Sequence, residues 1–475
     1  MRLGALARHL APADAAATAP GRARDPTLVG AAPVATEEQI IALDRTDAPT
    51  ETAPSRSAIV LALDDAQRTT VRLHPLWLRE RCGKVQESTG QRLFDVADCD
   101  GALSCEPELV ADGKTMRVAF EDGTVGNFAV DALCAELGLS AARNPERIPL
   151  PEKKPWSGAD GAADDMSFPL AKLRQFDAQG PDPEPVLLGK IADQLLAYGA
   201  VVVRNVRGTA GPSDDAEVVK FARKLGVVRE TEWGRWFDVT TKQSRDDDAL
   251  AEDLAYTNEA IDVHMDNVYR EPVPNFWCLH CVETGGGDDT SGMSLISDAL
   301  YAAEILRQED PVGFAVLTHV KVAFKYVADG IALVRHVPHI ALAEDGVTIT
   351  QLTYSGRLDA VDGATYSFET LEAYYKARAR WIAIARANAQ TFKLSPGDMV
   401  MLDNRRIFHG RNAIDGSYDD SAPPRFMQGC YIDCDGVEST HRVYQMGLQA
   451  DAAEEAADQS GVTRAFDAWV EARDD

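Results

Sequence analysis

Three residues of the sequence have the types and the spacing of ligands for one metal ion. His264 and Asp266 stand two positions apart. On an extended strand such residues point to the same face, so both side chains can reach one ion. His409 supplies a second imidazole far downstream. Two neutral imidazoles and one carboxylate form the facial triad that holds ferrous iron and leaves positions open for oxygen and a co-substrate.

Arg425 is the residue that we expect to bind the co-substrate. It stands sixteen positions after His409 (425 − 409 = 16), at the start of the hydrophobic run 426–432. A guanidinium in an apolar strand needs a partner, and a bidentate salt bridge to a dicarboxylate co-substrate supplies one. A structural salt bridge to a carboxylate elsewhere in the fold is the alternative.

The segments around these residues resemble those of one enzyme family. The order His264-x-Asp266, a long insertion, His409 and then Arg425 is similar to that of the iron- and 2-oxoglutarate-dependent oxygenases. Four further segments narrow the resemblance to the gamma-butyrobetaine hydroxylase and trimethyllysine hydroxylase group of the TauD-like oxygenases: residues 254–258, 272–274, 279–281 and 409–411. The resemblance extends from about residue 77 to residue 442.

The resemblance implies a hydroxylase that uses Fe(II), 2-oxoglutarate and O2. His264, Asp266 and His409 are then the catalytic residues that bind the iron, and Arg425 anchors the far carboxylate of 2-oxoglutarate. The keto acid is converted to succinate and CO2 as an unactivated carbon of the substrate is hydroxylated.

Two other polar residues are candidates for binding the co-substrate. Ser294 can help to hold 2-oxoglutarate, or it is an ordinary turn or strand serine. Arg411 follows the ligand His409 by two positions. It orients substrate or co-substrate, or it pairs with a nearby aspartate.

Aromatic residues indicate the class of substrate. A trimethylammonium group donates no hydrogen bonds, so proteins hold it against the faces of aromatic rings. Members of the resembled group build such a cage, and aromatic residues stand here at the matching positions, Trp233, Phe237, Tyr256 and Tyr431. Trp236 is an alternative to Phe237, because the local alignment depends on few residues.

Asp253 bears on the chemical group at the other end of the substrate, which the sequence does not identify. It stands three positions before Tyr256, where butyrobetaine hydroxylases have an asparagine. A carboxylate there repels a substrate carboxylate and favours an amine, which resembles the trimethyllysine hydroxylases. We expect a small quaternary ammonium substrate like gamma-butyrobetaine, as in carnitine biosynthesis. Trimethyllysine, a trimethylammonium phosphonate and a non-quaternary acid are alternatives, and a non-catalytic ligand-binding jelly roll is a remote one.

The elements that position these residues predict a mainly β protein with flanking helices. Residues 169–445 have the pattern of a double-stranded β-helix, or jelly roll, in which strands distant in sequence face one another. Apolar patterns predict helices in this core at residues 184–197, 214–225 and 367–388, and strands at residues 199–205, 399–402 and 426–432.

Four other segments surround the oxygenase core. Residues 1–55 are rich in Ala, Pro, Thr and Asp and predict a disordered extension. Short alternating runs predict a small β-rich domain over 56–140, followed by a linker over 141–168. Residues 446–475 predict an acidic C-terminal helix, which can dock on a partner subunit, so a homodimer is possible.

Charge and composition restrict the partners. A formal net charge of −27 argues against nucleic acid and anionic membrane surfaces. No apolar run is long enough for a membrane span. Eight cysteines without a disulfide pattern favour reduced thiols in the cytoplasm, although residues 1–26 faintly resemble an organellar transit peptide. Many relatives carry a Cys-x-Cys-x-x-Cys zinc cluster where only Cys82 stands here, so we predict no structural zinc.

Overall fold

The structure is a computed structural model that divides between Ile148 and Pro149 into two units, each described separately below. The residues that it describes are 28–34, 58–63, 70–82, 95, 97, 105–110, 114–137, 148–158, 174–206, 216–240, 254–285, 290–328, 330–356, 361, 363–414 and 425–458. None of the helices in these ranges is long and apolar enough to cross a membrane.

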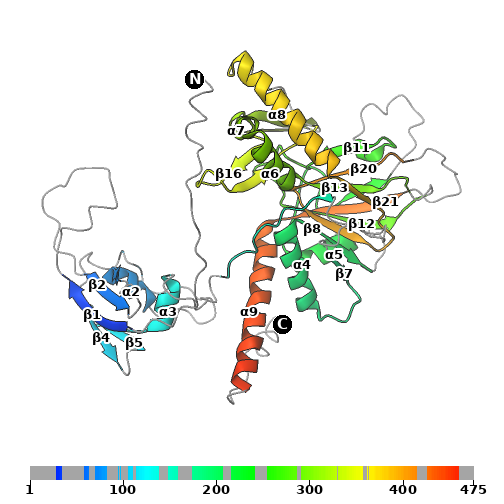
Figure 1. Ribbon diagram of the computed structural model, residues 1–475. Helices are drawn as coiled ribbons and strands as arrows, with labels where there is room; N and C mark the ends of the chain where they lie inside the picture. The colour runs from blue at the N-terminus through cyan, green and yellow to red at the C-terminus, as the bar shows by residue number, and fades with distance from the viewer. Residues whose placement is uncertain are drawn as a thin grey trace. The chain divides into compact units, whose positions relative to one another are not determined.

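The described residues of the smaller unit form two antiparallel sheets of three strands each. In one strand, Met116, Val118 and Phe120 are buried and their neighbours are not, which is the period-2 pattern of a sheet with one covered face. The strands are β1 (Leu28–Val34), β2 (Ala58–Leu63), β3 (Thr70–Leu73), β4 (Cys105–Val110), β5 (Thr115–Phe120) and β6 (Val125–Ala129). Helices α2 (Pro75–Arg81) and α3 (Val130–Glu136) accompany them (Figure 1). This confirms the small β-rich domain.

β1 corrects part of the prediction for residues 1–55. The segment was expected to be disordered, yet residues 28–34 pair with β2, with Val34 opposite Ala58. Its sequence contains Gly30 and Pro33, two residues that weaken a strand signal, so the pairing depends on the partner strand. The rest of the expected extension, including the possible transit peptide, lies outside the described residues.

The larger unit contains two main sheets. The seven-stranded sheet has the order β10-β21-β12-β19-β8-β7, with β9 beside β21, and the four-stranded sheet has the order β11-β20-β13-β18. The larger sheet consists of β7 (Gln175–Asp177), β8 (Ala200–Arg204), β9 (Val228–Arg229), β10 (Phe237–Thr240), β12 (Phe276–Glu283), β19 (Met399–Asp403) and β21 (Phe426–Ile432). The smaller one consists of β11 (Ile261–His264), β13 (Ser294–Asp298), β18 (Gln390–Phe392) and β20 (Ile407–Arg411). This is the predicted jelly roll.

Both faces of the seven-stranded sheet are covered at its centre, so the central strands β8 and β19 are buried without alternation. In β8, Val201 and Val203 face a cluster that includes residues of the two helices α4 (Glu184–Tyr198) and α5 (Glu217–Leu225). The alternate residues Ala200 and Val202 face a second cluster with Ile296 of the smaller sheet. The space between the two sheets is therefore lined by apolar side chains.

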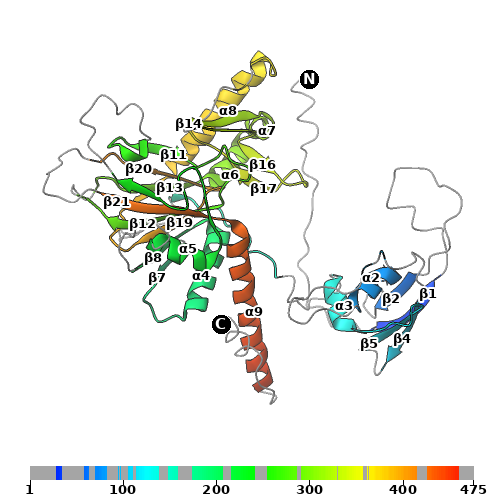
Figure 2. The same cartoon turned by 180° about the vertical axis from the view of Figure 1, so that it is seen from behind.

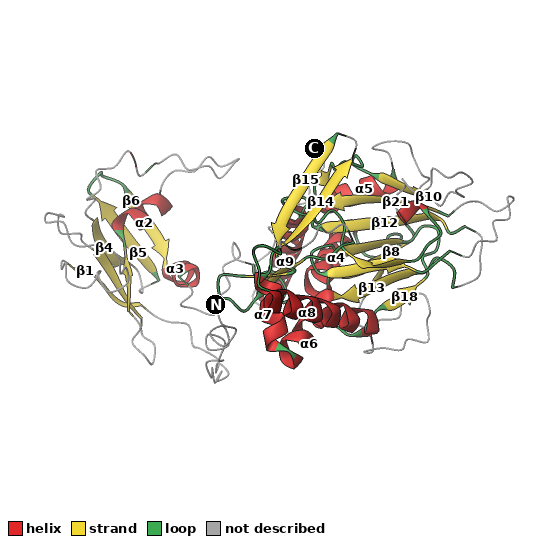
Figure 3. Ribbon diagram, turned by 90° about the horizontal axis from the view of Figure 1, so that it is seen from above, coloured by secondary structure: helices red, strands yellow, loops and turns green. Residues whose placement is uncertain are grey.

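Three further helices form a group beside the sheets (Figures 1 and 3). They are α6 (Ala299–Glu309), α7 (Pro311–His319) and α8 (Phe368–Ala387). Their core also includes residues of the hairpins β14 (Val322–Ala328) with β15 (Ile331–Val337) and β16 (Ile340–Leu342) with β17 (Ile349–Leu352). The hydroxyl of Ser367 caps α8 by accepting a hydrogen bond from the backbone N–H of Thr370. The predicted helix over 367–388 is therefore confirmed, and the fold as a whole is mixed α/β.

Two boundaries differ from the expectations. Helix α9 (Cys434–Asp458) begins directly after β21 and packs along α4, so it starts well before the predicted acidic helix (Figures 1 and 2). Residues 149–158 fall in the predicted linker, yet Trp156 is only 1% exposed and lies in the core between the sheets. A single tryptophan in a polar, Pro-rich stretch is a weak sequence signal for a core residue. Only the packing of Trp156 in the structure shows that this segment belongs to the core.

A buried ion pair joins several parts of the larger unit. Arg406, directly before β20, donates to both carboxylate oxygens of Asp298, at 3.1 and 2.7 Å. It also donates to the carbonyls of Ala197 and Lys154, at 2.8 and 2.7 Å. Asp298 in turn caps α6 by accepting from the N–H of Leu300 at 3.0 Å. One guanidinium therefore fixes the end of α4, the start of α6 and the strand that bears His409.

We expect Asp298→Ala to lower the free energy of unfolding by about 3–5 kcal/mol, because it leaves the buried charge of Arg406 without a partner. Urea denaturation measures the change. The matched control is Glu372→Ala, which breaks an exposed pair with Lys376, whose side chains are 52% and 74% exposed. That variant should cost about 0.5 kcal/mol or less. Equal effects of the two variants would contradict the role of the buried pair.

His339 is a second buried polar group, with no exposed surface. Its Nδ1 donates to the carbonyl of Thr353 at 2.7 Å, which leaves Nε2 to accept from the hydroxyl of Tyr374 at 2.9 Å. Burial, assisted by Arg378, lowers the pKa of His339 from 6.5 to about 4 and outweighs the opposing hydrogen bond to Thr353. The imidazole is therefore neutral in the folded protein near neutral pH.

The lowered pKa predicts a loss of stability in acid. Below pH 6.5 the unfolded chain binds a proton at His339, whereas the folded chain binds it only near pH 4. The free energy of unfolding therefore decreases as the pH is lowered from 6.5 to about 4. Between about pH 7 and about pH 4.5 this group should cost about 2 kcal/mol. His339→Gln can keep both hydrogen bonds and does not titrate. Urea denaturation should show a shallower pH dependence for this variant, and an identical one would refute the assignment.

Candidate active site

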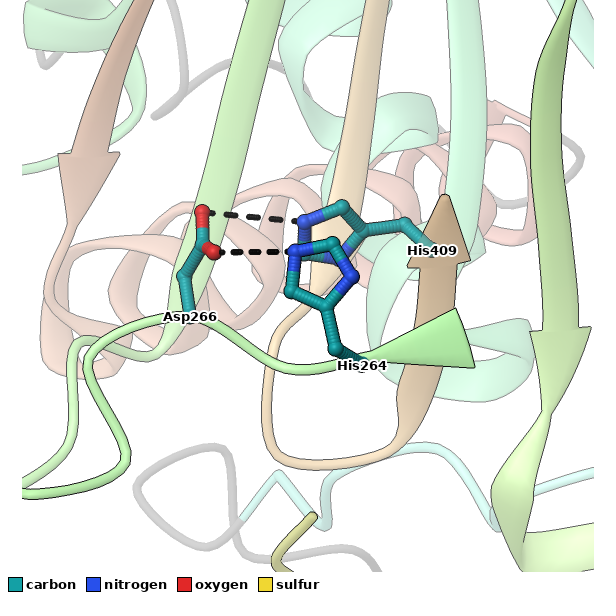
Figure 4. A group of neighbouring side chains, drawn as sticks. All are labelled: His264, Asp266 and His409. Carbon is teal, nitrogen blue, oxygen red and sulfur yellow. Dashed lines mark ion pairs between the residues drawn. The ribbon is translucent and has the colours of Figure 1, made fainter. Parts of the chain in front are cut away.

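The pairing of β11 with β20 brings the predicted metal ligands together. The two strands are antiparallel, and His264 lies directly opposite His409 (Figure 4). Asp266 follows β11 after one residue and turns its carboxylate toward both imidazoles. The ligand atoms of these three residues lie within 4.8 Å of one another. Among the described residues no other group of three or more His, Cys, Asp or Glu side chains has this arrangement.

The distances within the triad fit one shared ion. The Nε2 atom of His264 is 3.4 Å from Oδ1 of Asp266, and Nε2 of His409 is 3.6 Å from Oδ2 of Asp266. The two imidazole rings are 4.3 Å apart between centroids. Two imidazole nitrogens and one carboxylate are a donor set suited to ferrous iron.

Neighbouring groups orient the two imidazoles. Nδ1 of His264 lies 2.9 Å from the carbonyl of Asp262, and because a carbonyl only accepts, Nδ1 carries the proton. Nε2 is then the unprotonated nitrogen that faces the centre of the triad. The ring of His409 stacks on Trp277, with centroids 4.4 Å apart. Both rings are thereby held with Nε2 toward Asp266.

Asn404 fixes the backbone of the carboxylate ligand. The N–H of Asp266 donates to Oδ1 of Asn404 at 2.8 Å, and Nδ2 of Asn404 donates back to the carbonyl of Asp266 at 2.8 Å. Nδ2 also donates to the carbonyl of Pro274 at 3.1 Å. The side chain of Asn404 is 1% exposed and belongs to the turn before β20. Asp266 is therefore tied to the strand that carries His409.

The protonation states match those that a metal needs. Removal from water opposes ionisation of Asp266, but the two neighbouring imidazoles, His409 first, outweigh it and hold the pKa of this carboxyl well below its usual value. Burial and the neighbouring His264 lower the pKa of His409, against the opposing effect of Asp266. The site thus favours a carboxylate beside a neutral imidazole near pH 7.

The triad lies in the wall of a cavity of about 560 Å³. The predicted residues that line it are Trp233, Phe237, Tyr256, His264, Asp266, Ser294, His409, Arg411, Arg425 and Tyr431. Trp236 does not line this cavity and packs against the helix-covered face of the larger sheet, so Phe237 takes the position in the wall. Asp253 lies outside the described residues.

Arg425 is 7% exposed and lines the cavity. A glycine allows its close approach to the neighbouring backbone. A Cβ on Gly285 would come within 2.8 Å of the backbone N of Arg425, and Gly285 has a φ of +76°, which favours glycine. A buried guanidinium at the edge of a cavity suits a carboxylate ligand.

Ser294 and Arg411 lie opposite each other in the pairing of β13 with β20. The guanidinium of Arg411 donates to the carbonyls of Thr257 at 2.9 Å and Leu254 at 3.5 Å. These residues flank Tyr256 in and after the short 3₁₀ helix η7 (Leu254–Tyr256). These backbone contacts fasten the segment with Tyr256 to the strand that carries His409.

The predicted aromatic residues come from three separate parts of the chain. The ring of Phe237 lies 5.3 Å from that of Tyr431, across neighbouring strands. Trp233 meets Tyr326 edge to face at 6.1 Å. Gly429 is the strand partner of Phe237, and a Cβ there would lie 2.2 Å from Cζ of the ring. The glycine therefore lets the Phe237 ring lie flat across β21.

Several site residues were not foreseen. They are Trp277 and Asn404, which hold the ligands, and Asp262, Tyr354 and Asn267, which also line the cavity. Because β12 is buried on both faces, its sequence contains no alternation that would place Trp277 beside the ligands. The polar residue Asn404 directly after an apolar strand was a visible signal. The contacts themselves join residues far apart in sequence and could not be read from it.

The chain matches one protein family over more than half of its length. Residues 167–431 match the family described as Taurine catabolism dioxygenase TauD, TfdA family. The chain is 28% identical to Dioxygenase str8 of Strobilurus tenacellus, over 76% of this chain and 82% of that protein. It is 27% identical to the mitochondrial trimethyllysine dioxygenase of Rattus norvegicus, over 80% and 84%. It is also 27% identical to the gamma-butyrobetaine dioxygenase of Pseudomonas sp. (strain AK-1), over 78% and 90%.

We expect Asp266→Ala to weaken Fe(II) binding by more than about a hundredfold, because loss of a residue that merely supports a ligand already costs about 10–100-fold. Anaerobic titration with Fe(II) measures the affinity, and thermal unfolding checks the fold. The matched control is Asp262→Ala. Its carboxylate is 55% exposed and pairs with Arg386, while its backbone carbonyl, which orients His264, is retained. Tight Fe(II) binding by Asp266→Ala would remove the triad assignment.

Proposed function

Because the chain belongs to the TauD, TfdA family of dioxygenases, we propose that it hydroxylates an aliphatic carbon of a small trimethylammonium compound. The chain is a 2-oxoglutarate-dependent dioxygenase that uses Fe(II). When bound, the iron supplies the oxidising chemistry that couples decarboxylation of 2-oxoglutarate to hydroxylation. The residues of this chain hold the reactants and exclude water.

The observation that carries the proposal is the aromatic wall of the cavity that contains the triad. Trp233, Phe237, Tyr256 and Tyr431 all line it. Aromatic faces attract a quaternary ammonium group through its positive charge, and this attraction requires no hydrogen bonds. The attraction strengthens as water is removed, and the ring of Tyr431 is only 3% exposed. Such a wall suits a trimethylammonium group held beside the iron site.

The polar residues have separate tasks in this proposal. His264, Asp266 and His409 hold Fe(II) through two imidazole nitrogens and a carboxylate oxygen. Arg425 receives the far carboxylate of 2-oxoglutarate, because a buried guanidinium forms two parallel hydrogen bonds with it. Ser294 contributes its hydroxyl near the co-substrate, since it lines the same cavity.

The names of two relatives support the substrate class. Trimethyllysine dioxygenase and gamma-butyrobetaine dioxygenase are both named for trimethylammonium compounds, and each is 27% identical to this chain. The acidic Asp253 before Tyr256 favours a substrate with an amine at its other end. Gamma-butyrobetaine, trimethyllysine and a trimethylammonium phosphonate are therefore the compounds to compare. A role in carnitine biosynthesis follows for the first two.

Succinate formation from 2-oxoglutarate by the Fe(II)-loaded protein, with ascorbate, tests the proposal. The panel contains gamma-butyrobetaine, trimethyllysine, trimethylaminoethylphosphonate and an uncharged isostere of each, in which carbon replaces the nitrogen. We expect one quaternary compound to stimulate turnover and its isostere to fail. Stimulation by a non-quaternary acid alone, or slow turnover that no quaternary compound increases, would refute the substrate class and retain the oxygenase.

We further expect Tyr256→Ala to raise the KM for the quaternary substrate by about thirtyfold, the equivalent of about 2 kcal/mol for a desolvated cation–π contact. The KM for 2-oxoglutarate should change little, because Arg425 is intact. The control is Tyr375→Ala, since Tyr375 is a 48% exposed tyrosine on α8, away from the cavity. Initial rates at varied substrate measure both constants. An unchanged KM in Tyr256→Ala would exclude this residue from the cage.

A further inference from the structure

We propose that Tyr431 is also a positioning residue for the iron: its hydroxyl fixes the carboxylate of Asp266 while its ring forms part of the aromatic cage. The role of the ring rests on the proposed function. The role of the hydroxyl requires only the metal site. One side chain would thus connect substrate recognition to the geometry of the metal.

The contact joins the two sheets of the jelly roll. The hydroxyl of Tyr431 donates to Oδ2 of Asp266 at 2.9 Å, across 165 positions of sequence. Tyr431 belongs to β21 of the larger sheet, and Asp266 follows β11 of the smaller sheet. In β21, Tyr431 is the strand partner of Trp277, the residue that stacks on His409. The larger sheet therefore contacts two of the three ligands from one side.

This hydrogen bond restricts the part of Asp266 that Asn404 does not. Asn404 bonds the backbone N–H and carbonyl of Asp266 and leaves the side chain able to rotate. The hydroxyl of Tyr431 then fixes the plane of the carboxylate. With its plane fixed, the carboxylate keeps Oδ1 at 3.4 Å from Nε2 of His264 and Oδ2 at 3.6 Å from Nε2 of His409. Groups that orient a ligand in this way raise the affinity for the metal.

Because Tyr431 is buried, its hydroxyl depends on the hydrogen bond to Asp266. The residue is 3% exposed, so its hydroxyl needs a partner within the protein. An ionised carboxylate is the strongest acceptor for a neutral O–H donor.

Phe237 provides the natural comparison. Its ring lies 5.3 Å from that of Tyr431 and lines the same cavity, but it has no hydroxyl. Substitutions of Phe237 and Tyr431 therefore separate the role of an aromatic ring from the role of the hydroxyl. Tyr431→Phe removes the bond to Asp266 and retains an aromatic face, whereas Phe237→Leu removes an aromatic face and leaves the bond to Asp266 in place.

Metal affinity is measured first, by anaerobic titration of the two purified variants with Fe(II), without 2-oxoglutarate or substrate. We expect Tyr431→Phe to raise the Kd for Fe(II) by about 10–100-fold and Phe237→Leu to leave it unchanged. Titration with Co(II) adds a spectroscopic readout. The visible ligand-field bands should shift in Tyr431→Phe and match wild type in Phe237→Leu, because only the first variant alters the carboxylate ligand.

Substrate binding is measured second, as the KM for the quaternary compound at saturating Fe(II). Tyr431→Phe should stay within about threefold of wild type, while Phe237→Leu should rise by about tenfold or more. Wild-type metal affinity and Co(II) bands in Tyr431→Phe would overturn the positioning role, whatever the substrate is. Weakened metal binding in Tyr431→Phe together with an unchanged KM in Phe237→Leu would retain that role and overturn the cage.

Discussion

The register between β11 and β20 is the constraint on which the site depends. His264 and His409 are strand partners, so their side chains leave the same face of the four-stranded sheet. A register shift of one residue would turn one imidazole to the opposite face of the sheet, and the three ligands would no longer converge. β11 is only four residues long and its register is irregular, so its own hydrogen bonds define the pairing weakly. Contacts from outside the strand have to supply the rest.

Those contacts come from buried polar residues around β20. Asn404 holds the backbone of Asp266, and Arg411 holds the carbonyls of Leu254 and Thr257. Arg406 connects the start of β20 to Asp298. Buried polar groups of this kind cost desolvation unless each finds its partner, so they specify one arrangement of the strands. The apolar space between the sheets then strengthens the electrostatic interactions within the cavity.

The sequence predicted the residues of the site better than their contacts. The spacing of His264 and Asp266 identifies a shared strand face, and an arginine beside apolar β21 indicates a buried anion partner. Local periodicity also located α8 and β21 within a residue. The bond from Tyr431 to Asp266 and the partners of Arg411 could not be predicted, because they arise between segments that only the fold brings together. For the same reason β1 was missed, since its strand character depends on β2.

The Tyr431 contact divides the aromatic residues of the cavity wall into two groups that differ in how freely their side chains can be replaced. Tyr431 is bonded to an iron ligand, and Tyr256 sits in a segment fastened to the iron-binding strand. Replacing Tyr431 removes a contact to Asp266 together with part of the cavity wall. Trp233 and Phe237 lie on the other side of this division, packed against Tyr326 and against the ring of Tyr431. New substrate preferences, in natural divergence or in a designed library, are therefore most accessible through Trp233 and Phe237.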